Sequence, residues 1–141
     1  MASTIDVTGK PAQTADSGCA EPLHIMMHGH NPFDCAIMFW RGTSGHAYVH
    51  SIFSLTGCPE VPAASVLFVK HNDADGSRAV LKVMNIEHDA PSLNRADIRR
   101  CGAQLGANEV HLHFASGDRL ARLTATFDLT TRHNSDKIVG R

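Results

Sequence analysis

Two apolar runs separated by a turn constrain the fold of this chain more than any other feature. Ser65–Lys70 and Ala79–Met84 are rich in residues that favour strands, and the segment between them contains the dipeptide Asp75-Gly76. An Asp-Gly dipeptide between two such runs is a strong signal of a β-hairpin, because the tight turn needs residues that tolerate left-handed backbone. The sequence therefore predicts an antiparallel hairpin.

A helix is expected after this hairpin. Asp89 or Ser92 can cap its first turn, where Pro91 is tolerated because its missing N–H would have no partner there. Gly106 suits the left-handed position just beyond the helix end. Four side chains recur at helical spacing and share the face expected to pack on the sheet: Asn94, Ile98, Cys101 and Leu105.

A strand and a second helix should follow. The side chains of Asn108–Phe114 alternate between apolar and polar, as they do in a strand with two different faces. Val110, Leu112 and Phe114 point one way, and Glu109, His111 and His113 point the other. The second helix, over 118–129, is expected to bury Leu120, Leu123 and Phe127.

Two earlier segments are expected to precede the hairpin in the sheet. Ala36–Arg41 is a short apolar run between turn residues, which favours a strand. Gly45–Leu55 is rich in β-branched and aromatic residues, although a helix from Ala47 onward remains open. The predicted fold class is α+β: one small domain, mainly antiparallel sheet, with a β-β-α-β-α core preceded by one or two strands.

Composition bounds the domain organisation. The 141 residues are 43% hydrophobic and 19% charged, as in a single globular domain. We expect a disordered N-terminal leader over 1–23, one domain over 33–129 and a flexible tail over 130–141. No apolar run approaches the roughly 20 residues that cross a bilayer, and no signal peptide is visible. We therefore expect no membrane partner and a cytoplasmic location.

Ten histidines in 141 residues are the most unusual feature of the composition. His111 and His113 lie two apart on one predicted strand, so their imidazoles could occupy two corners of a tetrahedral zinc site. His46 and His50 share a face if their segment is a strand, and they are further candidate ligands. No dense motif such as His-Glu-x-x-His accompanies them, and histidines on an open sheet face need no metal. Another cluster, His24, His28 and His30, could bind metal adventitiously.

Arginines form the third group of candidate site residues. The net charge of −1 gives no overall electrostatic case for nucleic acid. Four arginines on the predicted helices could still contact phosphate through their planar guanidinium groups. They are Arg95, Arg99, Arg119 and Arg122. An ordinary solvated helix flank is the competing interpretation.

The order hairpin, helix, strand, helix over residues 64–129 resembles the core of GIY-YIG nuclease domains. On this resemblance, Ser65–Val69 and Val80–Met84 occupy the two strand motifs, and Arg95 or Arg99 supplies the helix arginine. Neither strand contains a Tyr, since the single one is Tyr48, and the glycine of each motif is missing. The last helix offers no Glu as metal ligand. The resemblance thus implies a scaffold without nuclease chemistry.

Three functions remain open. The first is a non-catalytic binding or assembly module of unknown ligand, because the sequence lacks a paired acid and base, a dense metal motif and a phosphate loop. The hairpin edge and the strand Ala36–Trp40 could pair with another chain, which would give a homodimer. The second is a histidine-based metal-binding protein or metal-dependent enzyme, with zinc as the candidate cofactor. The third is a nucleic-acid-binding domain that uses the arginine-bearing helices.

Overall fold

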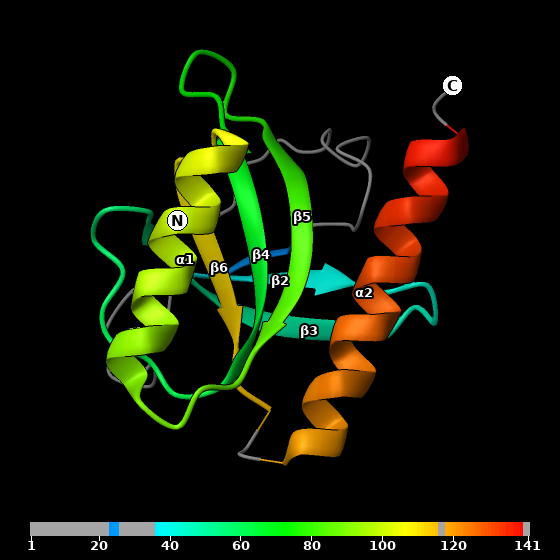
Figure 1. Cartoon of the computed structure of the whole chain (residues 1–141). Helices are drawn as coiled ribbons and strands as arrows, with labels where there is room; N and C mark the ends of the chain where they lie inside the picture. Colours follow the sequence, from blue (N-terminus) through cyan, green and yellow to red (C-terminus); the bar gives the residue numbers. More distant parts are fainter. Residues whose placement is uncertain (1–22, 26–35, 116–117, 140–141) are drawn as a thin grey trace.

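The computed structural model describes residues 23–25, 36–115 and 118–139. Within these residues, six strands form one antiparallel sheet in the order β1-β2-β3-β6-β4-β5, with two helices (Figure 1). The strands are β1 (Leu23–Ile25), β2 (Ile37–Arg41), β3 (Ala47–Ser54), β4 (Ala64–His71), β5 (Arg78–Ile86) and β6 (Glu109–His113). The helices are α1 (Pro91–Leu105) and α2 (Arg119–Val139). Neither helix has the length and apolar character needed to cross a bilayer.

The predicted α+β fold and its β-β-α-β-α core are confirmed as β4-β5-α1-β6-α2. Gly45–Leu55 contains strand β3, which settles the alternative of a helix there. Three strands precede the hairpin where one or two were expected. The additional strand, β1, begins at Leu23 and pairs with β2. The rest of the expected leader lies outside the described residues.

The predicted hairpin is present and tightly joined. Strands β4 and β5 pair from Ala64↔Ile86 to His71↔Arg78, with a register shift between Phe68 and Val69. Gly76 has a φ of 74°, a conformation that glycine adopts without the steric cost of a side chain. The sequence pattern of two apolar runs and a turn was sufficient here because all the contacts that define the hairpin are local.

The N-terminus of α1 differs from the expected one. Its N-cap residue is Ala90, without a capping side chain, so neither Asp89 nor Ser92 fills that role. The fully buried Asn94 organises this end instead. Its side chain accepts a hydrogen bond from the His88 amide at 3.0 Å and donates one to the Val61 carbonyl at 2.9 Å. Gly106 ends the helix as expected, with a φ of 80°.

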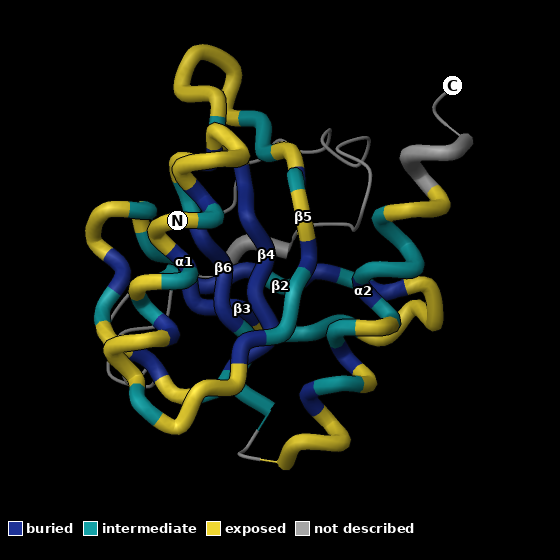
Figure 2. The backbone as a smooth tube through the Cα atoms, viewed as in Figure 1, coloured by how far each residue is buried: buried dark blue, intermediate teal, exposed yellow. Residues whose placement is uncertain are grey.

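The sheet is covered on both faces, so its central strands are buried on both sides (Figure 2). Alternate residues of β4 and β6 enter two different apolar clusters. Val66, Phe68, Val110 and Leu112 pack with Ile98 of α1. On the other face, Leu67 and Val69 of β4 pack with Trp40 of β2 and Leu129 of α2. Since α1 and α2 lie on opposite faces, β6 has no open face, contrary to the expectation for its histidines.

Helix α2 is rotated away from the predicted packing. Leu120 and Phe127, expected in the core, are each 72% exposed, whereas Arg122, Ala125 and Leu129 are buried. Polar contacts explain the rotation. Arg122 bonds Asn85 and Glu87, Thr126 bonds Ser65, and Asp128 bonds Ser44 and Tyr48. These contacts all lie on one side of α2, and they fix that side against the sheet.

Two further expectations are corrected by the fold. Strand β2, proposed as an edge that could pair with another chain, is paired on both sides, with β1 and with β3. The segment after Thr130, expected to be a flexible tail, continues α2 to Val139. A polar segment adds turns to an existing helix at little cost, because only helix nucleation is strongly unfavourable.

Candidate functional site

His111, the first candidate metal ligand, is fully buried and uses both ring nitrogens. Trp40 Nε1 donates a hydrogen bond to His111 Nδ1 at 2.9 Å. Indole is a donor only, so the proton of the neutral imidazole sits on Nε2. That atom donates to Glu109 Oε1 at 3.0 Å. With neither nitrogen free, His111 acts as a connector between β2 and β6 and is not available to a metal.

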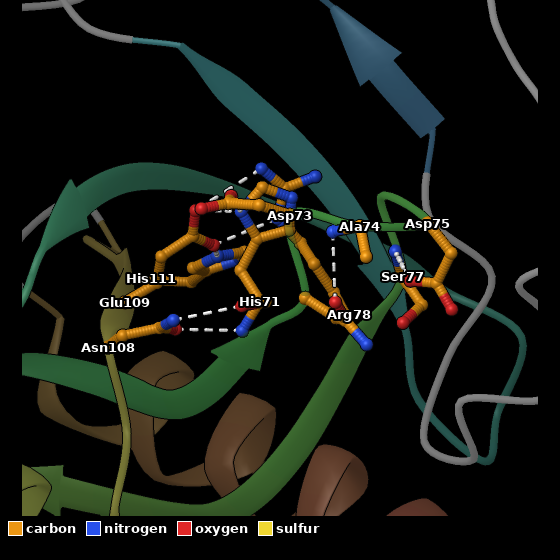
Figure 3. A network of polar contacts seen from close by, with 10 residues as sticks. His71, Asp73, Ala74, Asp75, Ser77, Arg78, Asn108, Glu109 and His111 are labelled. Atoms are coloured by element: carbon orange, nitrogen blue, oxygen red, sulfur yellow. Dashed lines mark hydrogen bonds and ion pairs between the residues drawn. The ribbon is translucent and has the colours of Figure 1, made fainter.

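Glu109 is the centre of a polar network at the start of β6 (Figure 3). Its carboxylate accepts hydrogen bonds from Arg78 Nε at 2.8 Å and from His111, and lies 3.3 Å from His71 Nδ1. Burial alone would raise the pKa of Glu109, but the hydrogen bonds from His111 and Arg78 outweigh burial and lower it to about 2. The carboxylate therefore remains charged and links β6 to both ends of the hairpin turn.

Neighbouring Asn108 reinforces this connection. Its side-chain amide pairs with the backbone of His71, accepting from the His71 N–H at 2.7 Å and donating to the His71 carbonyl at 2.8 Å (Figure 3). Among the described residues, no buried side-chain nitrogen or oxygen of this network lacks a hydrogen-bond partner. The arrangement is that of a satisfied structural network, because the Glu109 carboxylate and the His111 imidazole at its centre are engaged by the protein.

His50 and His113 differ from His111 in their unused nitrogens. His50 Nδ1 donates to the Tyr48 carbonyl and His113 Nδ1 to the Val49 carbonyl, each at 2.8 Å. A carbonyl only accepts, so both imidazoles keep the lone pair of Nε2. Their ring centroids are 5.6 Å apart. Burial, and then the neighbouring His113 and His111, hold the pKa of His50 well below its usual range. Burial also lowers the pKa of His113.

His46 and Tyr48 continue this row of rings. The Tyr48 ring lies between those of His46 and His113, with centroid distances of 4.6 Å to His46 and 5.3 Å to His113. The Tyr48 hydroxyl donates to Asp128 at 2.8 Å, and burial together with that carboxylate raises the pKa of Tyr48 to about 12. Within the described residues, no three His, Cys, Asp or Glu side chains are grouped as metal ligands. Of the four predicted ligands, the structure thus brings His50 and His113 into contact, leaves His46 beyond Tyr48 and engages both nitrogens of His111 elsewhere.

The four arginines proposed for nucleic acid do not form one surface. Arg95 and Arg99 lie on α1, whereas Arg119 and Arg122 lie on α2, across the sheet. Each one has a protein partner. Arg95 bonds Glu60, Arg99 bonds the carbonyls of Thr56 and Cys58, and both arginines of α2 bond Glu87. Their guanidinium groups therefore serve the fold.

A shallow pocket of about 550 Å³ lies beside the start of α2. Its lining includes Pro62, Ala63, His88 and the group of Glu87 with Arg119 and Arg122. Hydrogen bonds from the two arginines lower the pKa of Glu87 to about 2. Because this carboxylate already neutralises the arginines, the pocket offers no unpaired charge to an anion.

The feature that sequence reasoning missed is the exposed face of α2. Leu120 and Phe127, two of the three residues expected in the core, lie on it one heptad apart. The helical periodicity correctly indicated that they share a face, but not that this face is turned outward. The inward side is set by Arg122, whose burial depends on partners in Asn85 and Glu87 that the helical pattern does not show.

Comparison of the chain with protein-family models, curated proteins and solved structures finds no match. The resemblance to GIY-YIG nuclease domains therefore stays a prediction, and the function has to be inferred from the geometry of the chain itself.

Proposed function

We propose that this protein is a non-catalytic assembly module that forms a homodimer through the outer face of α2. The observation that supports this most directly is the exposure of Leu120 and Phe127, at 72% each, on an ordered helix. Exposed single apolar residues are ordinary, but two large ones aligned on one helix face are typical of a contact surface.

The spacing along this face is that of a helix-pairing seam. We define the outer seam as the residues Leu120, Thr124, Phe127, Thr131 and Asn134. They follow one another at intervals of four, three, four and three residues, which is the alternation that keeps a stripe facing a second helix. The seam contains no ionisable residue, in contrast to the buried side of α2 with Arg122 and Asp128.

A second copy of the chain is the partner that this seam fits best. A surface without charge meets its own copy without like-charge repulsion, and a two-fold interface requires such self-complementarity. The charges beside the seam already have partners, since Arg119 bonds Glu87 and Asp128 bonds Ser44 and Tyr48. A partner of opposite charge would thus find little to recognise.

The structure also supports a rigid presentation of the seam. The N-terminal half of helix α2 is held at three positions, by Arg122, by Thr126 and by Asp128. A surface ordered before binding loses less conformational entropy on association than a flexible one. The position of the seam on an anchored helix therefore favours a defined dimer over loose aggregation.

The test is to introduce a charge into the seam and measure the mass in solution. We expect Phe127→Lys to weaken dimerisation about 100-fold, corresponding to about 2.8 kcal/mol, because two lysines would be brought together in an apolar contact. Size-exclusion chromatography with light scattering over a range of concentrations measures this directly. The matched control is Leu93→Lys, which changes a leucine of α1 that is 52% exposed and should leave the dimer intact. A wild-type chain that stays monomeric at the highest attainable concentration would refute the proposal.

A further inference from the structure

His50 carries a buried acceptor that the protein itself does not satisfy. Its Nε2 is shielded from solvent and has no hydrogen-bond partner among the described residues. The proton of this neutral ring is held on Nδ1 by the Tyr48 carbonyl, so the free Nε2 presents a lone pair. Buried polar atoms in folded proteins nearly always have a partner, and a bound water or ion is one of the explanations for an exception.

His113 places a second lone pair nearby. Its Nδ1 is likewise bound to a backbone carbonyl, that of Val49, so its Nε2 is also the free nitrogen. A hydrogen bond from the far ring N–H to a carbonyl is the support found behind metal-ligating histidines, because it fixes both the tautomer and the ring orientation. His50 and His113 share this support and each keep a second nitrogen, whereas the second nitrogen of His111 already accepts from Trp40.

The separation of the two rings fits a common ligand. With a metal–nitrogen distance near 2.0 Å, two imidazoles bound through Nε2 to one ion hold their centroids roughly 5–6.5 Å apart, depending on the angle at the ion. The observed centroid separation of His50 and His113 is 5.6 Å. The observed separation thus lies within the range that a shared ion requires.

We propose that His50 and His113 bind one zinc ion, or a similar ion that prefers imidazole, through their Nε2 atoms. The remaining coordination positions belong to water, because no third ligand is grouped with them in the described part of the chain. The Tyr48 hydroxyl donates its hydrogen bond to Asp128 and is not a ligand of the ion. The ion gives the orphaned nitrogen of His50 a partner, and this role is independent of the outer seam of α2.

Histidine-ring nitrogen NMR tests the proposal directly at the two nitrogens that would bind the ion. The parent is the full chain with His24, His28 and His30 changed to Ala, so that the adventitious N-terminal cluster is removed. On titration with zinc chloride, we expect the Nε2 signals of His50 and His113 to shift together and to saturate at one ion per chain. The ring signals of His111 and His88 should stay in place, since hydrogen bonds engage His111 at both nitrogens and hold His88 against Asp97.

A substitution gives the second readout. We expect His113→Gln in the same parent to lower zinc affinity at least about tenfold, whereas the control His88→Gln, at an exposed histidine, should leave it unchanged. Unshifted Nε2 signals of His50 and His113 in excess zinc would overturn the proposal. So would zinc binding that disappears with the three N-terminal histidines, or an affinity that His113→Gln leaves intact.

Discussion

Glu109 shows how a single residue acquires its role from neighbours that are distant in the sequence. It takes hydrogen bonds from His111, two residues away, and from Arg78, 31 residues away. His111 in turn is held by Trp40, 71 residues away. The carboxylate thus connects three strands through contacts that are largely hidden from solvent. Its charged form is stabilised by folding, which makes the stability of the protein depend on pH.

The sign of this dependence follows from the lowered pKa. The unfolded chain protonates Glu109 near its ordinary pKa of about 4.3, whereas the folded chain does so only near 2. The stabilisation is therefore complete above the unfolded pKa and is lost as pH falls from about 4 to about 2. We expect Glu109→Gln to reduce the free energy of unfolding by about 2 kcal/mol at neutral pH and by less near pH 3. Urea denaturation at both pH values measures this.

The control for Glu109 is another glutamate with an arginine partner. Glu60 pairs with Arg95, but both side chains are considerably exposed. Exposed ion pairs contribute little, so Glu60→Gln should change stability by less than about 1 kcal/mol at either pH. An equal loss in the two variants would show that burial of the Glu109 network is unimportant.

At the scale of elements, the orientation of α2 is decided by side chains that the apolar pattern ignores. Asp128 accepts hydrogen bonds from the Ser44 amide at 2.9 Å and the Tyr48 hydroxyl at 2.8 Å, which ties α2 to the turn between β2 and β3. The close approach requires a glycine in that turn. A Cβ added at Gly42 would lie 2.2 Å from Asp128 Oδ2. A side chain at position 42 would therefore displace the carboxylate from its partners.

A pair of substitutions tests this contact. We expect Gly42→Ala to destabilise the wild-type chain by about 2 kcal/mol, because the new methyl group and the bound carboxylate cannot both fit. In an Asp128→Ala background the same change should cost less than about 0.5 kcal/mol, since nothing is left to displace. Thermal or urea unfolding of the four chains gives the coupling. Equal costs in both backgrounds would mean that Asp128 does not hold the turn.

At the scale of the whole molecule, stability should depend on protein concentration. Association that involves only the folded state stabilises that state by mass action. If the outer seam of α2 joins two copies, the wild-type melting temperature rises with concentration. We expect an increase of several degrees between about 1 and 100 times the dissociation constant, because a 100-fold excess contributes about 2.7 kcal/mol.

The charged seam variant provides the comparison. Phe127→Lys should melt at a temperature that is independent of concentration over the same range, and Leu93→Lys should behave like the wild type. Differential scanning calorimetry on the three chains distinguishes these outcomes. A concentration-independent melting temperature in the wild type would contradict the dimer.

The local sequence pattern predicts most of the helices and strands, but it does not predict which distant residues their side chains contact. The hairpin around Gly76 and the helix that ends at Gly106 were predictable, because turn chemistry and periodicity act between close neighbours. The cap of α1 was not, since Asn94 makes one of its hydrogen bonds to Val61, in a distant loop. The candidate site shows the same division: the shared face of His111 and His113 follows from alternation, but the partner of each ring does not.

The α+β class, the order of the core elements and the residues that share a face can be read from the amino-acid sequence, because these features depend on interactions within a few residues. Tertiary contacts were needed to place β6 and β4 in the interior of the sheet, with β5 at its edge and helices on opposite faces. The same is true of the hydrogen bonds from Trp40 and to Glu109 that engage both nitrogens of His111. The unpartnered nitrogen of His50 and the outward orientation of Leu120 and Phe127 likewise follow from the tertiary structure. The physical reason is that an apolar stripe specifies a face, whereas buried polar pairs formed across the fold select which face is turned inward.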